Sequence, residues 1–200
     1  MKQSLIYLLV FAVGVILAVS NLIPDALLND NISKWVLYTL LFFVGIQIGA
    51  SKNMFTAVRR YGWKIVLVPL ATTIGTFAGV ALIILLLPDR SLTDCLSIGA
   101  GFAYYSLSSI IISEYRGAEL GTVALLANIM REFIVLIAAP WLVKYFGKLA
   151  PISAGGATTM DTTLPIITKF SGTEYVVIAL FHGMVIDFSV PLWVSFFLSF

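Results

Sequence analysis

The sequence predicts an all-α integral membrane protein, with about five transmembrane helices and two oppositely oriented re-entrant hairpins. Three observations predict this class: 60% of the residues are hydrophobic, only 11% are charged, and the mean hydropathy is +1.03. Soluble domains are roughly 45–50% apolar and about 25% charged. We therefore expect residues 1–200 to form a single membrane transport domain.

The same composition argues against several other functions. The net charge of +2 is small for a nucleic-acid-binding protein. The single cysteine, Cys95, excludes an internal disulfide and any multi-cysteine metal site. The sequence has no P-loop, dinucleotide, GxSxG or HExxH motif, so we expect no enzyme, no cofactor and no metal. A membrane aspartyl protease is disfavoured because neither Asp161 nor Asp187 lies in a GxGD motif.

The first two apolar runs set the orientation of the chain. Residues 4–19 lack a clear small-x-small cleavage site, so we predict a retained span rather than a signal peptide. Residues 34–49 form the second span, and a basic cluster follows it. By the positive-inside rule this cluster is cytoplasmic, which places the amino terminus inside and makes the third span, residues 63–87, run outward. The cluster consists of Lys52, Arg59, Arg60 and Lys64.

The next apolar segment, residues 92–113, is polar at its centre. A complete crossing would turn the following run, residues 119–146, so that Lys144 and Lys148 face outward, against the positive-inside rule. If the segment enters from outside and returns there, both lysines become cytoplasmic. We therefore predict a re-entrant hairpin rather than a span.

A second segment, residues 151–170, is again short and centrally polar. We predict that it enters from inside and returns there, which leaves residues 174–200 as a last span with the carboxyl terminus outside. The first hairpin covers about residues 95–113. Glycine and proline disfavour a continuous helix in both hairpins. The predicted hairpin-breaking residues are Gly99, Gly101, Gly155, Gly156 and Pro165.

Each hairpin follows a long span, and this order predicts an inverted repeat. The two units, residues 63–113 and 119–170, have opposite topology because their spans run in opposite directions. Inverted repeats with interrupted helices that meet near the midplane are typical of secondary transporters.

Glu132 is the first candidate site residue, because it lies near the centre of its predicted span. A carboxylate at the bilayer midplane is costly and is a functional candidate by default. Asn128 precedes Glu132 by one helical turn and shares its face. Arg131 points about 100 degrees away, so a direct pair with Glu132 is not expected. The alternative is a structural ion pair between Glu132 and another helix.

The second hairpin offers an aspartate and hydroxyls where it turns. Hydroxyls, freed backbone amides and half-helix ends bind the carboxylate or amine of a substrate. Alternatively, Asp161 only caps the return arm that opens at Leu164. The hydroxyl residues beside Asp161 are Thr158, Thr159, Thr162 and Thr163.

The first hairpin carries polar side chains that would lie opposite Asp161. They either bind a polar substrate or anchor the hairpin at the interface and satisfy its backbone. These residues are Tyr104, Tyr105, Ser106, Ser108 and Ser109.

Asp187 is a further candidate in the middle of the last span. Pro191 follows one turn later, where a kink would free a carbonyl. Alternatively, Gly183 and Ser189 mark a close helix contact. His182, the only histidine, is interpreted as buried and hydrogen-bonded rather than as a proton relay.

Five segments, in order and over nearly the whole chain, resemble the bacterial and archaeal lysine exporter family. They are LLFFVGIQIG ending at Gly49, GFAYYSLSS from Gly101, ALLANIMRE from Ala124, GGATTMDTTLP from Gly155 and HGMVIDFSVP from His182. The pattern GGATxMDxTLP is the specific one.

This resemblance implies export of L-lysine, and of toxic lysine analogues, across the cytoplasmic membrane by proton or sodium antiport. It also implies that Glu132 matches the family's intramembrane glutamate. Moving a cation outward against the membrane potential requires about 2.3 kcal/mol per charge per 100 mV, which the coupling ion supplies. Glu132 would alternate between the coupling cation and the substrate amine. The alternatives are an ion-coupled transporter of another small metabolite, or a non-transporting membrane subunit that requires a partner.

The chain departs from the family pattern in one respect. Longer members carry an additional amino-terminal hydrophobic module with a second important carboxylate, and we expect this chain to be a short form without it. A homodimer in the lipid bilayer, or a complex with a small membrane subunit, would then complete the path. Asp187 is a candidate to replace part of the missing acid.

Overall fold

A computed structural model of the chain describes residues 62–87 and 90–200, together with isolated positions before them. The residues described below all belong to one compact unit, Leu40–Phe200. The predicted spans at residues 4–19 and 34–49 lie outside the continuously described part of the chain, as does the orientation of the amino terminus.

Every regular element in residues 62–87 and 90–200 is helical, and three helical segments there are long and apolar enough to cross a membrane. They correspond to the predicted third span, the long run from residue 119, and the last span, so the all-α membrane class is confirmed for the described residues. The first segment consists of η2 (Gly62–Val66), α4 (Leu67–Ile83) and η3 (Ile84–Leu86). The second is α7 (Ala118–Phe146). The third consists of η5 (Thr173–Tyr175) and α10 (Val176–Leu198).

Two interrupted helix pairs flank α7 in the sequence. The first helix pair is α5 (Leu92–Gly99) and α6 (Tyr105–Arg116), joined by residues 100–104, here named the first tip. The second helix pair is α8 (Ala150–Gly155) and α9 (Leu164–Ser171), joined by residues 156–163, the second tip, which contains η4 (Gly156–Met160). At about 1.5 Å per residue, each of these helices is too short to cross about 30 Å of hydrocarbon.

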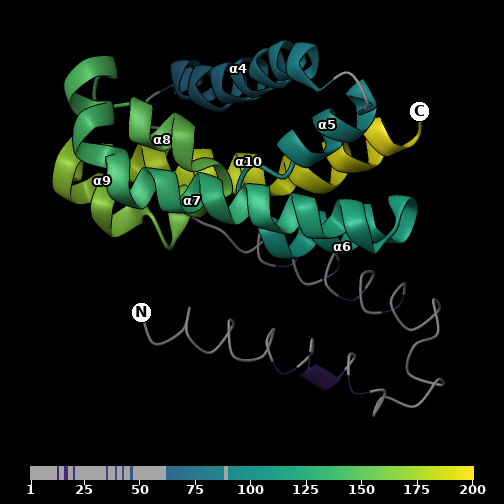
Figure 1. Ribbon diagram of the computed structural model, residues 1–200. Helices are drawn as coiled ribbons and strands as arrows, with labels where there is room; N and C mark the ends of the chain where they lie inside the picture. The colour runs from purple at the N-terminus through teal and green to yellow at the C-terminus, as the bar shows by residue number, and fades with distance from the viewer. Residues whose placement is uncertain are drawn as a thin grey trace. The chain divides into compact units, whose positions relative to one another are not determined.

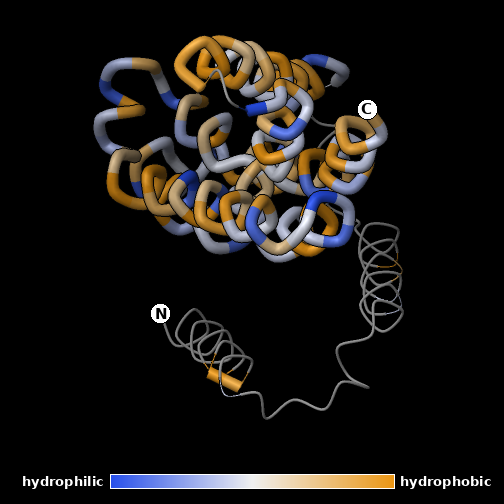
Figure 2. Tube along the Cα trace, turned by 45° about the vertical axis from the view of Figure 1, so that its right-hand side comes forward, coloured by the Kyte–Doolittle hydropathy of each residue, from blue (hydrophilic) through white to orange (hydrophobic). Residues whose placement is uncertain are grey.

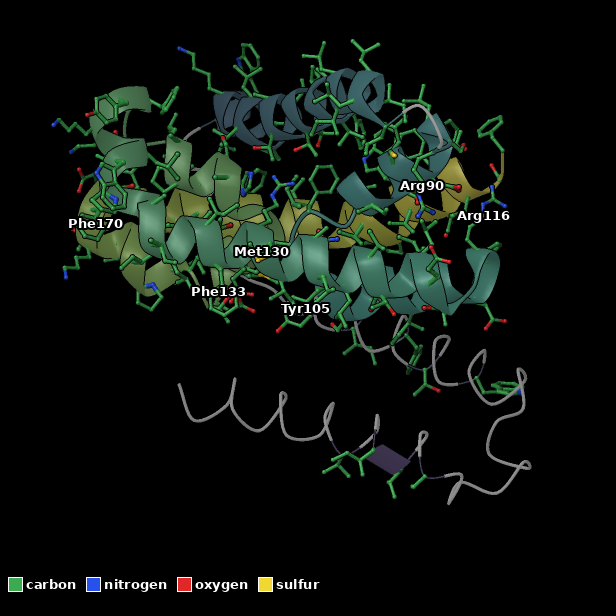
Figure 3. The ribbon with its side chains drawn as sticks, viewed as in Figure 1. Arg90, Tyr105, Arg116, Met130, Phe133 and Phe170 are labelled. Carbon is green, nitrogen blue, oxygen red and sulfur yellow. The ribbon has the colours of Figure 1, made fainter. Side chains whose placement is uncertain are left out.

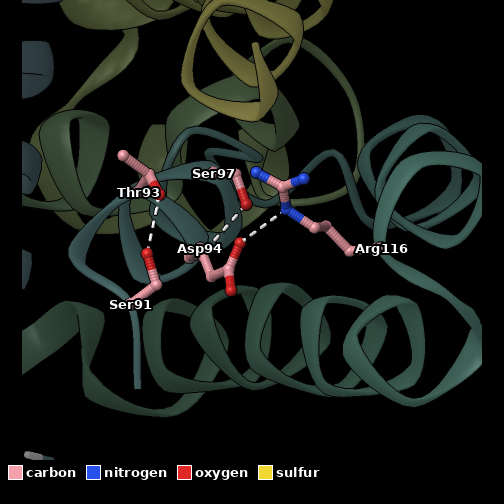
Figure 4. Close-up of polar contacts among 5 residues, drawn as sticks. All are labelled: Ser91, Thr93, Asp94, Ser97 and Arg116. Atoms are coloured by element: carbon pink, nitrogen blue, oxygen red, sulfur yellow. Dashed lines mark hydrogen bonds and ion pairs between the residues drawn. The ribbon is translucent and has the colours of Figure 1, made fainter. Parts of the chain in front are cut away.

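Each helix pair is closed by an ion pair at the end opposite its tip. Near the start of α5, the Asp94 carboxylate accepts a hydrogen bond of 2.9 Å from Nε of Arg116, the last residue of α6 (Figure 4). Lys148, just before α8, bonds to Glu174, just after α9, at 3.2 Å. In each pair, the start of the first helix and the end of the second helix therefore lie close together, away from the tip.

The long helix α7 connects the two helix pairs. Figure 1 shows α5 and α6 toward one end of α7 and α8 and α9 toward the other, with α10 running behind α7. In Figure 3, Arg90 and Arg116 mark the first end and Phe170 the second. The ends of the two pairs that are closed by ion pairs thus lie at opposite ends of α7, and the two tips point toward its middle.

Two kinds of apolar surface fit this arrangement. Ile152, Ile167 and Ala179 are buried together and join the second helix pair to α10. The outer surfaces carry large exposed hydrophobic side chains, among them Leu82 and Ile137, and Figure 2 shows how frequent hydrophobic residues are along the helices. Outward-facing apolar side chains are expected where a protein meets lipid.

The structure corrects where the first helix pair is broken. The residues with positive φ are Phe102 (44°) and Ala103 (70°), and neither predicted glycine breaks the helix by its φ angle. Gly99 is the last residue of α5. Gly101 is required for space instead, because a Cβ there would collide with the Asn128 side chain.

The second helix pair agrees with the prediction at one residue and corrects another. Gly156 has a φ of 60° at the junction of α8 and η4, as expected of a hairpin-breaking glycine, and Gly155 is the last residue of α8. Pro165 breaks no helix. It lies in the first turn of α9, where the missing N–H has no helical acceptor in any case.

Candidate functional site

The two tips contact each other through their backbones. The N–H of Ala157 in the second tip donates a hydrogen bond to the carbonyl of Phe102 in the first tip over 2.9 Å. A Cβ on Gly156 would collide with that same carbonyl, so only glycine fits there without a shift. Phe102 is fully buried. The contact brings the two interrupted segments together inside the described unit.

Asn128 of α7 holds the first tip. Its Oδ1 accepts a hydrogen bond from the N–H of Ala103 at 2.8 Å, and its Nδ2 donates to Ile98 and Ala124 carbonyls at 3.1 and 2.9 Å. The positive φ of Ala103 takes its N–H out of the helical pattern, and the asparagine supplies the missing acceptor. Because Asn128 is 3% exposed and its amide group is fully engaged, it positions the tip, whereas we expected it to face substrate.

Arg131, one residue before Glu132, holds the second helix pair. Its Nε donates to the Ala154 carbonyl at 2.8 Å, and its Nη2 donates to the Ser153 carbonyl at 3.2 Å and to Thr76 Oγ1 of α4 at 3.3 Å. These carbonyls lie near the carboxyl end of α8, which carries partial negative charge. Arg131 therefore turns away from Glu132, as its helical position predicted.

Three threonines of the second tip satisfy its own backbone. The hydroxyl of Thr158 donates to the Gly155 carbonyl at 2.8 Å, and the hydroxyl of Thr163 donates to the Thr158 carbonyl at 2.9 Å. Thr159 lies 2.9 Å from the carbonyl oxygens of Gly156 and Ala179. All three threonines are buried, so they stabilise the break rather than line an open site.

Two serines of the first helix pair also bond to backbone carbonyls. Ser108 donates to the Tyr104 carbonyl at 2.8 Å, and Ser109 donates to the Ser106 carbonyl at 3.3 Å. These bonds fit the alternative in which the hydroxyls bind the backbone of the segment, and substrate binding by Ser108 and Ser109 stays a prediction. Ser106 is exposed and Tyr105 is partly exposed at the start of α6.

His182 joins α4 and α10 to the second tip. Its Nε2 lies 2.9 Å from Thr72 Oγ1, and its Nδ1 lies 3.2 Å from Thr159 Oγ1. The histidine is fully buried, so its interpretation as a buried, hydrogen-bonded residue is confirmed. The neighbouring Gly183 marks a close helix contact, since a Cβ there would lie 2.8 Å from the Cβ of Met160.

Four of the predicted site residues gather beside the tips, and we name them the polar centre. Asp161 lies close enough to Glu132, Asp187 and Tyr104 for its charge to act on all three. Glu132 is the middle residue of α7, with fourteen residues of the helix on each side. The Thr162 side chain lies within reach of the Glu132 carboxylate. The polar centre consists of Tyr104, Glu132, Asp161 and Asp187.

Asp161 does not cap the return arm. The N-cap of α9 is Thr163, and its side chain makes no capping hydrogen bond. The Asp161 carboxylate instead accepts the N–H of Thr162 at 2.5 Å, and the Asp161 side chain is exposed. The capping alternative is therefore wrong, and Asp161 is accessible at the polar centre.

The acids of the polar centre do not form a metal site with one another or with their neighbours. In the described ranges, no group of three or more His, Cys, Asp and Glu side chains is placed to hold a metal ion.

Arg131 and Phe102 are the two central residues that the sequence interpretation did not include in the site. The Arg131 guanidinium lies over the Phe102 ring, 5.5 Å from its centroid. A signal for Arg131 was present, because an ionisable residue inside a predicted span is a functional candidate in its own right. Phe102 had no such signal, since a phenylalanine in an apolar segment is ordinary.

A membrane protein with apolar helices around interrupted helix pairs, and with carboxylates where their tips meet, has the features of the transporter class. The chain belongs to the lysine exporter family: the family model described as "Lysine exporter LysO" matches residues 8–198. The family is one of exporters, not of enzymes.

Two curated relatives carry the same description. The lysine exporter LysO of Escherichia coli (strain K12) is 32% identical over 168 residues, which are 82% of this chain and 54% of the relative. A putative lysine exporter of Haemophilus influenzae (strain ATCC 51907 / DSM 11121 / KW20 / Rd) is 34% identical over 166 residues, covering 83% of this chain and 84% of the relative. The chain thus spans about half the length of the Escherichia coli relative. No solved structure matches the chain.

Proposed function

We propose that this chain exports L-lysine across the cytoplasmic membrane in exchange for a proton or a sodium ion. The observation that supports this most is the polar centre, where the middle residue of α7, Glu132, lies beside the contact between the two tips. The names of the two relatives supply the substrate. Three carboxylates in one place favour a cation over an anion.

In this proposal the two helix pairs are re-entrant hairpins that enter the membrane from opposite faces and form an inverted repeat. The closed ends of the pairs at opposite ends of α7, and the shortness of their helices, support it. Among the described residues the lysines gather at the end of the second pair, whereas Arg90 and Arg116 lie at the first end, so the positive-inside rule assigns the end with more basic residues to the cytoplasm. These lysines are Lys64, Lys144, Lys148 and Lys169.

Substrate recognition follows from two carboxylates of the polar centre, those of Glu132 and Asp161. Glu132 and Asp161 bind the ammonium groups of lysine, because opposite charges interact strongly where water is scarce. The helix α6 begins in the polar centre, and its N-cap, Tyr104, makes no side-chain capping bond. The first turn of a helix attracts anions through its aligned N–H groups and the helix dipole, so the start of α6 suits the carboxylate of the substrate.

The test is counterflow of radiolabelled L-lysine in proteoliposomes that contain the purified full chain. We expect labelled lysine to accumulate in proteoliposomes preloaded with unlabelled lysine. In proteoliposomes preloaded with glutamate we expect no accumulation of labelled lysine. Counterflow of another labelled metabolite, without counterflow of lysine, would support a different substrate. No lysine flux with or without a proton or sodium gradient would refute the proposed function.

A further inference from the structure

Asp187 differs from the other buried polar side chains near the tips. It is 5% exposed, and its carboxylate has no hydrogen-bond or ion-pair partner among the described residues. Asn128, His182 and Thr159, which are buried to a similar degree, are all hydrogen-bonded. A buried carboxylate without a donor is unfavourable as a bare anion, so Asp187 requires a proton or a bound cation.

The backbone around Asp187 adds to the unsatisfied acceptors. Pro191, four residues later, has no N–H, so the Asp187 carbonyl lacks its helical donor. The hydroxyl of Ser189, two residues after Asp187, donates to the Ile186 carbonyl at 2.7 Å. The Asp187 carbonyl therefore lacks its i+4 donor, and the Asp187 carboxylate lacks a donor among the described residues.

The groups that face Asp187 come from the two tips. The charge of Asp161 in the second tip acts on Asp187, and the charge of Asp187 in turn acts on the neutral hydroxyl of Tyr104 at the start of α6. His182 is held by its own threonine partners. The helix α4 has no charged residue. The charged residues of α5, α6 and α9 lie near the ends remote from the tips: Asp94, Glu114, Arg116 and Lys169.

Asp161 interacts electrostatically with two carboxylates, those of Asp187 and Glu132, which have different surroundings. Its charge acts on Asp187, which is buried without a partner, and on Glu132, which is half-buried and has Thr162 within reach. We infer that Asp187 carries the coupling proton, that Glu132 binds the substrate ammonium, and that Asp161 links the two. This inference rests on the proposed function. It assigns ion coupling to Asp187 and substrate binding to Glu132.

The linkage follows from charge alone. While Glu132 and Asp161 are unoccupied, their negative charge favours the protonated form of Asp187. When a lysine cation binds from the cytoplasm, it offsets that charge, the O–H bond of the Asp187 carboxyl breaks, and the proton passes to cytoplasmic water. When lysine leaves on the other side, Asp187 takes a proton from external water. One lysine cation moves outward for each proton that moves inward.

The experiment compares three measurements on the purified full chain. Lysine is added to wild-type protein in weakly buffered detergent, and we expect release of about one proton per lysine bound. In proteoliposomes we compare lysine–lysine exchange with accumulation driven by a pH gradient. For Asp187→Asn we expect exchange within about twofold of wild type, no proton release, and at least a tenfold loss of pH-driven accumulation. Asp187→Glu should retain all three, and Ser189→Ala serves as a control on the same helix.

Each contrary outcome is distinct. Retained pH-driven accumulation in Asp187→Asn would overturn the inference, and so would the absence of proton release from a wild-type protein that exchanges lysine. Loss of exchange in a monodisperse Asp187→Asn protein would make Asp187 a substrate ligand instead. Accumulation that follows a sodium gradient and ignores pH would also overturn it. If the wild-type protein exchanges no lysine at all, the proposed function fails first, and the inference fails with it.

Discussion

The N–H of Ala157 donates to the carbonyl of Phe102 over 2.9 Å, and this bond joins the two tips at the centre of the described unit. Each side of the contact is held by α7: Asn128 bonds to the residue after Phe102, and Arg131 bonds to carbonyls near the end of α8. The middle of one helix therefore sets the positions of both interrupted segments. The acid of the polar centre on that helix, Glu132, follows Arg131 directly.

Gly156→Ala is expected to separate the tips. The new Cβ would collide with the Phe102 carbonyl at a φ of 60°, and overpacking of this kind costs roughly 1–3 kcal/mol beyond the backbone strain. Gly62→Ala is the matched control, because Gly62 has a φ of 64° and open space around it. We expect Gly156→Ala to lower the unfolding temperature and the lysine flux well below those of Gly62→Ala. Equal behaviour of the two variants would show that the tip contact is unimportant.

Arg131→Met is expected to loosen the second helix pair. Charge-assisted hydrogen bonds contribute about 1.5–3 kcal/mol each, and the substitution removes the bonds to Ser153 and Ala154. Arg90→Met is the control: the Arg90–Glu119 pair is solvent-exposed and contributes about 1 kcal/mol or less. Thermal unfolding in detergent should therefore separate the two variants, with Arg131→Met clearly less stable. An Arg131→Met protein as stable as Arg90→Met would contradict this role.

Thr72 and Thr159 are expected to be coupled energetically through His182. The imidazole has one hydroxyl partner on each nitrogen, so loss of either threonine leaves a buried ring nitrogen unsatisfied, at a cost of about 1–3 kcal/mol. A double-mutant cycle of Thr72→Val and Thr159→Val, followed by unfolding temperature, measures the coupling. Strictly additive effects would argue against a shared histidine bridge.

Much of this architecture follows from the sequence because hydropathy and charge are local signals. The long apolar helices appear where continuous apolar runs predict them, and the two interruptions appear where glycine and hydroxyl residues accumulate. Glu132 and Asp161 were recognisable because carboxylates inside apolar segments are costly.

The details of the tips depend on contacts between distant segments and were therefore not predictable. Phe102 and Ala103 adopt positive φ angles because Asn128 and Ala157 satisfy the strained backbone. The same contacts assign Asn128 to the scaffold, although sequence spacing alone placed it beside Glu132. Burial likewise separates the three threonines that stabilise the second tip from Thr162, which is exposed.

Opposite sidedness of the two tips is testable by cysteine accessibility. Ser106 and Thr162 are the suitable positions because both are exposed, whereas Ser108 and Thr159 are buried. In a Cys95→Ser background, we expect a membrane-impermeant thiol reagent to label Ser106→Cys from outside and Thr162→Cys from the cytoplasmic side of inverted vesicles. Labelling of both positions from the same side would contradict re-entrant hairpins of opposite orientation.

The most direct test of the central claim, that lysine crosses at the polar centre on α7, is labelled-lysine counterflow by Glu132→Gln against Glu119→Gln. Both changes remove a carboxylate from α7, but Glu119 is an exposed residue in its first turn. We predict at least a hundredfold loss of lysine flux for Glu132→Gln and flux within about twofold of wild type for Glu119→Gln. Wild-type counterflow by a correctly folded Glu132→Gln protein would contradict the account.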